Sequence, residues 1–139
     1  MTIDDRLEIM EQIGRYSYAE DGGDAAAYAA LFTDNGVFEV YLRDGAEPTQ
    51  RHEGRAAIEA WASGRYEERP EGLQTRHHQT GIVFDELESD RAVTRTELLV
   101  TRLYPDAVAP VPSVMGAYRD EWRKTPEGWR FTRRAVRMD

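Results

Sequence analysis

The sequence predicts an α+β domain in which a curved antiparallel β-sheet wraps around three helices of the N-terminal half and leaves an internal pocket. Two observations carry this prediction. Apolar residues recur at helical spacing in the first half of the chain, whereas the second half holds long β-rich segments separated by turn signals. The 139 residues fit one domain that is large enough to bury a core, so we expect a single domain over residues 1–139.

The first two helices are separated by a pair of glycines. Helical periodicity predicts a first helix over residues 3–20, which ends at Gly22-Gly23. Asp24 is a good N-cap for a second, alanine-rich helix over residues 25–32. The apolar stripe of the first helix is formed by Ile3, Leu7, Ile9, Met10, Ile13, Tyr16 and Ser17.

A strand, a loop and a third helix follow. The turn signal at residues 33–36 leads into an expected strand over residues 37–41. The sequence then becomes polar, which predicts a surface loop over residues 42–53. Inward-facing alanines, an isoleucine and a tryptophan predict a helix over residues 55–63, and a second polar loop comes after it.

The rest of the chain is expected to form four antiparallel strands. Turns at residues 88–90 and 125–128 join them in pairs as hairpins. The three prolines of residues 105–112 cannot continue a ladder, so this segment is a loop that could cover a cavity. A strongly curved sheet with a helix at its mouth leaves room for a small ligand. The strands are expected at residues 74–87, 91–104, 113–124 and 128–138.

Composition limits the partners and the cellular setting. A net charge of −8 argues against a nucleic-acid partner, because binding phosphates needs a basic face. The one basic cluster, within residues 130–137, splits between two faces of a strand. No apolar run approaches the length of a membrane span, and the N-terminus lacks the basic start and apolar block of a signal peptide. The absence of cysteine rules out disulfides and thiolate metal sites, and it is compatible with the cytoplasm, where we expect this protein.

Two histidines stand next to each other in the segment Thr75–Gly81. Because neighbouring side chains of a strand point to opposite faces, one of His77 and His78 can enter the cavity while the other faces outward. The same geometry prevents both from binding one metal ion, so we expect neither a metal nor a cofactor. Taken alone, a strand histidine is more often held for structure, and a carboxylate such as Asp21 before two glycines is often an exposed loop residue.

Four passages follow one another along the chain: residues 15–24 with 31–34, residues 54–58, residues 75–78, and residues 116–121 with 128–130. Together they resemble the SnoaL-like family of the nuclear transport factor 2-like superfamily, which includes scytalone dehydratase and polyketide cyclases. The resemblance covers nearly the whole chain and implies a cone-shaped α+β fold with an internal pocket. Because this family holds dehydratases, isomerases and cyclases as well as proteins without catalysis, the fold alone does not settle the function.

The resemblance implies a catalytic pair. Asp21 falls at the aspartate, and His77 at the histidine, that pair in members similar to scytalone dehydratase. In that role His77 is a general base whose tautomer is fixed by Asp21. This sequence also departs from the pattern, because Glu20 replaces a pocket tyrosine and no second histidine appears around Thr101. Tyr118 falls near a polar pocket position of the family and is a candidate replacement hydroxyl.

The expected pocket wall combines aromatic and polar side chains. Each aromatic could equally be ordinary core, since a small α+β domain needs such residues in any case. His78 is kept as the alternative inward-facing histidine, while His52 stands in polar surroundings and is expected to be solvated. The residues expected to contact the substrate are Tyr16, Glu20, Phe32, Trp61 and His78.

These expectations converge on an enzyme that acts on a small, hydrophobic, oxygenated molecule by His-Asp acid–base catalysis. A dehydratase, which is a lyase, is the first expectation, and an isomerase or a cyclase would use the same base. A non-catalytic ligand-binding or assembly domain is the alternative from another class. An epoxide hydrolase built on Arg119, Asp120 and Glu121 is a third hypothesis. We expect a homodimer, with a trimer as the other option.

Overall fold

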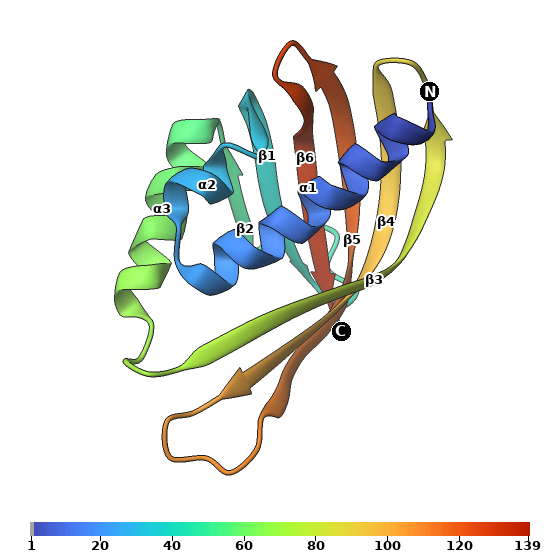
Figure 1. Ribbon diagram of the computed structural model, residues 1–139. Coiled ribbons are helices and arrows are strands. Elements are labelled where there is room, and N and C mark those ends of the chain that lie inside the picture. The colour runs from blue at the N-terminus through green and yellow to red at the C-terminus, as the bar shows by residue number, and fades with distance from the viewer. Residues whose placement is uncertain (1) are drawn as a thin grey trace.

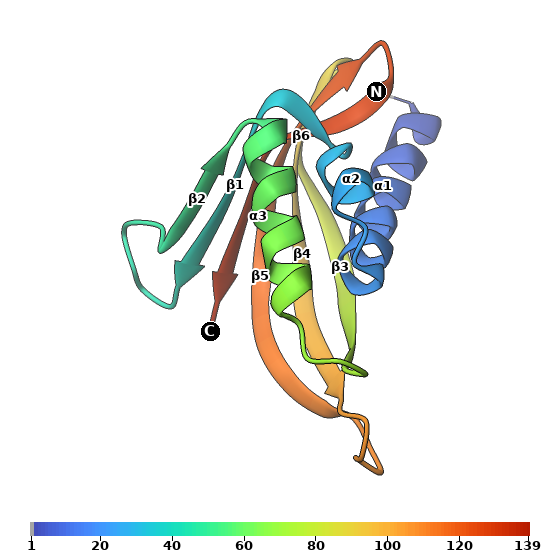
Figure 2. The same cartoon turned by 90° about the vertical axis from the view of Figure 1, so that its left-hand side faces the viewer.

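The computed structural model describes residues 2–139, and over this range it contains three helices and one six-stranded sheet (Figure 1). The strand order is β2-β1-β6-β5-β4-β3, in which β1 and β6 are parallel and the other neighbours are antiparallel. The sheet curves around the helices without closing, which confirms the α+β prediction (Figure 2). The elements are α1 (Ile3–Gly22), α2 (Ala25–Ala29), β1 (Phe32–Leu42), β2 (Gln50–Glu53), α3 (Arg55–Glu68), β3 (Gln74–Leu87), β4 (Arg91–Leu103), β5 (Val111–Thr125) and β6 (Gly128–Met138).

Side-chain and glycine caps set the limits of the first two helices. At the start of α1, Thr2 and Asp5 form a reciprocal capping box. The helix ends before Gly23, whose φ of 70° lies in the left-handed region that glycine adopts without strain. Asp24 then accepts a hydrogen bond from the backbone N–H of Ala27 at 3.0 Å, so the predicted N-cap of α2 is confirmed. This arrangement places residues 20 and 21 in the last turn of α1.

The start of β1 differs from the prediction. The second helix ends at Ala29 rather than at residue 32, and Phe32 already pairs with Phe131 of β6. An irregularity in the β1–β6 register between Phe32 and Val37 accommodates the segment that looks like a turn in the sequence. Pairing with a distant strand therefore overrides the local turn signal.

Two further boundaries were wrong. The segment predicted as a polar loop contains β2, an edge strand whose Glu53 pairs with Val37 of β1. The third helix continues to Glu68, five residues beyond its predicted end, and therefore carries Arg65 into the interior. Both β2 and the end of α3 have a polar composition, so the sequence pattern did not indicate them. Edge strands and the solvent-facing ends of helices need few apolar residues.

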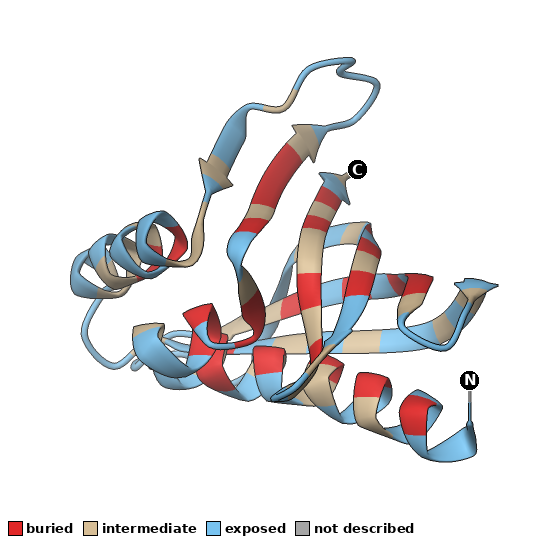
Figure 3. Ribbon diagram, turned by 90° about the horizontal axis from the view of Figure 1, so that it is seen from above, coloured by how far each residue is buried: buried red, intermediate tan, exposed pale blue. Residues whose placement is uncertain are grey.

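The core lies between the concave face of the sheet and the helices. Buried positions follow the face of α1 that is turned toward the sheet and recur along β1 and β6 (Figure 3). The indoles of Trp122 and Trp129 are fully buried, as expected for residues that pack on the sheet. Trp129 also donates its indole N–H to Asp5 at 2.9 Å and so fastens the start of α1 to β6.

In residues 2–139, no helix combines the length and the apolar character needed to span a membrane.

Alanine substitutions at two glycines should change the unfolding free energy in opposite directions, because one glycine is tightly packed and the other is not. A Cβ at Gly36 would lie 3.0 Å from Cβ of Phe32 and 3.1 Å from the Phe131 carbonyl oxygen. We expect Gly36→Ala to lower the unfolding free energy by about 1–3 kcal/mol through overpacking. Gly14→Ala is the matched control in the interior of α1, where a Cβ meets no atom within 4 Å, and it should stabilise by about 0.5–1 kcal/mol. Urea denaturation measures both changes, and equal stability of the two variants would contradict the prediction.

Candidate active site

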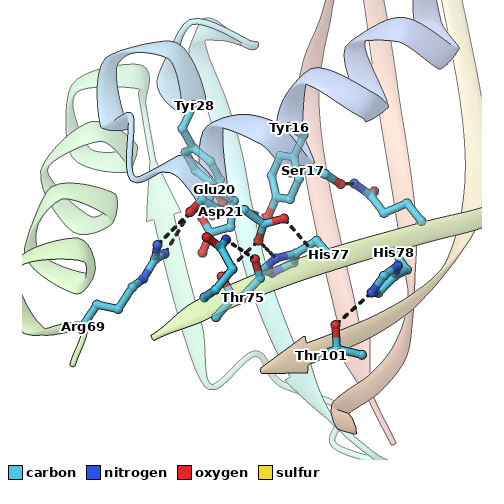
Figure 4. Close-up of polar contacts among 12 residues, drawn as sticks. Tyr16, Ser17, Glu20, Asp21, Tyr28, Arg69, Thr75, His77, His78 and Thr101 are labelled. Carbon is cyan, nitrogen blue, oxygen red and sulfur yellow. Dashed lines mark hydrogen bonds and ion pairs between the residues drawn. The ribbon is translucent and has the colours of Figure 1, made fainter. Parts of the chain in front are cut away.

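Asp21 and His77 lie in direct contact between the last turn of α1 and strand β3 (Figure 4). His77 Nδ1 is 2.6 Å from Asp21 Oδ1, and the backbone N–H of His77 donates to Asp21 Oδ2 at 2.9 Å. The Thr75 hydroxyl donates to Oδ1 at 3.1 Å. The Asp21 and His77 side chains are only 6% and 14% exposed. The structure thus brings together the two residues that the sequence proposed as a pair.

This arrangement fixes the tautomer of the imidazole. Burial tends to raise the pKa of Asp21, but the hydrogen bonds from His77 and Thr75 outweigh it and hold that pKa below its usual value. An ionised carboxylate only accepts hydrogen bonds, so Nδ1 of His77 carries a proton when the ring is neutral. The lone pair is then on Nε2, which makes no hydrogen bond to any group in residues 2–139. His77 lines the large cavity of the cone, so this nitrogen is available to a bound molecule.

The cavity has a volume of about 880 Å³ and is lined by residues of α1, α3 and the sheet. That volume is within the range of pockets that hold drug-sized molecules. Its wall is mainly apolar, with a few polar side chains at separate points. The apolar contributors include Phe38, Val40, Trp61, Leu98, Val100 and Val136.

Glu20 faces the cavity but its carboxylate is fully engaged. Arg65 of α3 donates from both Nη1 and Nη2, each at 2.7 Å, and the Tyr66 hydroxyl donates at 2.8 Å. Burial tends to raise the pKa of Glu20, yet these hydrogen bonds and the charge of Arg65 bring that pKa below its usual value. Glu20 is therefore an anchor between α1 and α3 rather than a second base.

Sequence reasoning missed the arginines of α3. Arg65 binds Glu20 and lies over the Trp61 ring at 4.1 Å from its centroid. Arg69 donates to the backbone carbonyls of Glu20 and Asp21 at 2.9 and 3.1 Å, which satisfies groups left free at the end of α1. Helical spacing alone could not place both arginines, because Arg65 lies in the last turn of α3 whereas Arg69 is its C-cap residue with an extended backbone.

Tyr16 and Tyr118 line the cavity as expected, and both are buried. Their rings meet edge to face with centroids 5.7 Å apart. The Tyr16 hydroxyl is 3.0 Å from that of Tyr28. Burial raises the pKa of Tyr118 well above its usual value, so its hydroxyl remains protonated at neutral pH.

Two residues expected to contact the substrate lie elsewhere. Phe32 is fully buried in the core between Tyr28 and Phe131, with ring centroids 5.9 and 5.2 Å away, and does not line the cavity. His78 points to the opposite face of β3, where its Nε2 is 2.9 Å from the Thr101 hydroxyl (Figure 4). His78 faces away from the cavity because neighbouring side chains of a strand alternate between its two faces. Phe32 lies in the core because β1 begins at this residue and pairs it with Phe131.

Trp61 lines the cavity as expected, and its ring is covered by another aromatic ring that was not expected there. His52 stacks on it with centroids 4.5 Å apart and an interplanar angle of 22°. His52 therefore covers Trp61 with one face of its ring but stays partly exposed to solvent. Burial and the nearby charge of Arg65 lower the pKa of His52.

A second buried charged group lies behind the two cavity tyrosines. Arg134 and Asp120 are fully buried, with Arg134 Nε 3.2 Å from Asp120 Oδ1. Arg134 lies over the rings of Tyr118 and Tyr16 at 3.5 and 4.0 Å and donates to the side-chain carbonyl of Gln79. The Arg119 side chain is about half exposed and pairs at the surface, so it does not join Asp120 as the epoxide-hydrolase hypothesis required.

Burial raises the pKa of Asp120 from 3.8 to about 7, although the charge of Arg134 acts in the opposite direction. The folded state then binds a proton more tightly than the unfolded state does. Its contribution to stability is fully present below pH about 4 and is lost as the pH rises through about 7, at no more than about 1.4 kcal/mol per pH unit. We expect Asp120→Asn to remove this slope, as measured by urea denaturation from pH 4 to 8. An unchanged slope in the variant would contradict the assignment.

Comparison with solved structures gives three informative neighbours. A nuclear transport factor 2-like protein with a cystatin-like fold from Novosphingobium aromaticivorans is 30% identical, with 98% of this chain and 82% of that chain covered and a TM-score of 0.78. A Catenulispora acidiphila protein, solved in complex with S-DNPA, is 26% identical over 96% of this chain and 92% of that chain, with a TM-score of 0.78. ActVI-ORFA from Streptomyces coelicolor is 23% identical over 96% and 97% of the two chains, with a TM-score of 0.80, and supports the fold alone.

Sequence comparison identifies the family directly. No curated protein matches the chain. The family described as SnoaL-like domain matches residues 1–135. The structural neighbours share the same curved sheet and helices, as the resemblance implied. The chain therefore belongs to the SnoaL-like family and has the nuclear transport factor 2-like, cystatin-like fold.

Proposed function

We propose that this chain is an enzyme in which His77, oriented by Asp21, acts as general base and then general acid on a small, hydrophobic, oxygenated molecule. One observation carries the proposal: the 2.6 Å contact between His77 Nδ1 and Asp21 Oδ1 at the wall of an apolar cavity. The contact fixes the tautomer and leaves Nε2 as the acceptor of a substrate proton. Asp21 also stabilises the imidazolium that forms after proton transfer.

Elimination of water is the reaction class that we propose first. Nε2 of His77 removes a proton from the carbon next to a carbonyl, and the electron pair of the C–H bond moves onto the carbonyl as an enolate. As the enolate collapses, a carbon–carbon double bond forms and the β-hydroxyl leaves with the proton of the imidazolium as water. A positioned base contributes roughly 10²–10⁴-fold to such a rate. Isomerisation or ring closure would use the same first step.

Tyr118 is the proposed donor to the enolate oxygen. Its side chain lines the cavity, and its raised pKa keeps the hydroxyl protonated at neutral pH. A donor aimed at developing negative charge in a site shielded from water is among the strongest means of lowering a barrier. Glu20 does not compete for this role, because its carboxylate is already bound by Arg65.

A non-catalytic binding domain remains the alternative from another class. The Catenulispora acidiphila protein, which was solved with S-DNPA, supports the use of this fold to hold a small molecule. Ligand binding alone would need the cavity but not the buried contact between His77 and Asp21. The two hypotheses therefore differ in one measurable outcome. The enzyme requires the His77 imidazole to accelerate a reaction, and the binding domain does not.

Substitution of the two neighbouring histidines tests the proposal. We expect the wild-type protein to accelerate deuterium exchange at the α-carbon of aromatic ketones such as β-tetralone, and His77→Ala to lose about 10²–10⁴-fold of that rate. His78→Ala is the matched control, since its side chain lies on the opposite face of β3 and binds Thr101. Proton NMR in D₂O measures the exchange. Equal rates in the wild type and the His77 variant would favour the non-catalytic alternative.

Asp21→Asn tests the orienting role separately. The amide can accept a hydrogen bond from Nδ1 but can also turn its NH₂ group toward the ring, and it has no charge to stabilise an imidazolium. We expect at least a tenfold lower exchange rate while β-tetralone still binds, because Asp21 itself does not line the cavity. Fluorescence titration provides the affinity. A full exchange rate in this variant would remove Asp21 from the mechanism.

A further inference from the structure

Arg102 lies on the same wall of the cavity as His77. In the β3–β4 ladder, Thr75 pairs with Arg102 and His77 pairs with Val100. Side chains two residues apart on one strand share a face, so Arg102 is the diagonal neighbour of His77, and such neighbours lie about 7–8 Å apart. Both residues line the cavity.

The guanidinium of Arg102 has no partner among the described residues. Within residues 2–139 it makes no hydrogen bond, ion pair or aromatic contact, and its Nε is shielded from solvent without a hydrogen bond. The two other arginines of the cavity are engaged, Arg65 by Glu20 and Arg69 by backbone carbonyls. Arg43 and Arg76 also lack a partner in the described chain, but both are exposed to water.

The shielded Nε–H of Arg102 forgoes the hydrogen bond that water would otherwise supply. A carboxylate restores it best, because its two oxygens match the fork of the guanidinium. A phosphate dianion fits less well, since only one guanidinium of this cavity is free to neutralise it. Glu68 lines the same cavity, but no ion pair joins it to Arg102 in the described chain. The free cation therefore points to a ligand with a single carboxylate.

We infer that the molecule bound in this cavity carries a carboxylate that pairs with Arg102 and holds the reacting carbon beside His77. The placement of a reacting carbon beside His77 rests on the proposed function, whereas the pairing of a carboxylate with Arg102 does not. Arg102 would then select the substrate and position it, since an anchor on the neighbouring strand fixes the distance to Nε2. The substrate class becomes a hydrophobic, oxygenated monocarboxylic acid.

Paired probes that differ only in charge test the carboxylate site. We expect 1-naphthaleneacetate to bind the wild-type protein about tenfold or more tightly than 1-naphthaleneacetamide, as measured by isothermal titration calorimetry near neutral pH. Arg102→Gln should abolish this preference and leave the affinity for the amide nearly unchanged. Arg102→Lys keeps the charge but loses the fork, so it should retain part of the preference.

Arg76→Gln is the matched control, because it removes the same charge from an exposed position of β3 and should keep the full preference. Phenylacetate and 2-naphthoate, each with its amide, extend the test to other sizes. The inference is wrong if no acid of this set binds the wild type more tightly than its amide, including the case in which none binds at millimolar concentration. It is also wrong if the preference survives in Arg102→Gln.

The outcome for Arg102 is separable from that for His77. We expect His77→Ala to keep the preference for naphthaleneacetate, because the anion is held by Arg102 and not by the imidazole. A preserved preference together with unchanged ketone exchange in His77→Ala would support the carboxylate site and overturn the catalytic proposal. Loss of exchange in His77→Ala, together with no preference for the acid in the wild type, would support the catalytic proposal and overturn the carboxylate site.

Discussion

One carboxylate, that of Asp21, joins the last turn of α1 to β3 at the edge of the cavity, and the candidate site is built on this contact. It accepts hydrogen bonds from the Thr75 hydroxyl and from both the ring and the backbone of His77. α1 crosses the concave face of the sheet, so fixing its end against β3 closes one side of the cone. The bonds that close the wall also orient the imidazole. Fold and site therefore share the same few atoms, and a change in one alters the other.

The last turn of α1 carries two adjacent carboxylates at the end where a helix dipole is already negative, and it contains no basic residue of its own. Left alone, Glu20 and Asp21 would repel each other and the free carbonyls. The chain supplies the compensating charge from α3, through Arg65 on Glu20 and Arg69 on the carbonyls. Asp21 is then left to His77.

The sequence predicted the architecture well where the pattern was strong, as in α1 and the strands from β3 to β6. It placed the start of β1 too late, because the pairing of Phe32 with β6 depends on residues almost one hundred positions away. The contact between Asp21 and His77 could be predicted only through the family resemblance, since no local spacing relates residues 56 positions apart. Arg65 was missed because the end of α3 looks like a polar loop.

The same residue type serves two different purposes inside this cone. Arg134 is surrounded behind the cavity by Asp120, the side-chain carbonyl of Gln79 and the faces of two tyrosines, so it holds strands β3, β5 and β6 together. Arg102 has no such surroundings, and its strand carries it into the cavity instead. A β-ladder is a rigid spacer, because neighbouring strands keep a fixed separation. The base on β3 and the free cation on β4 are therefore held at a fixed separation. They also fix which end of a bound molecule carries the anion. On a mainly apolar wall, these two groups select a substrate by the distance between its anion and its acidic C–H bond.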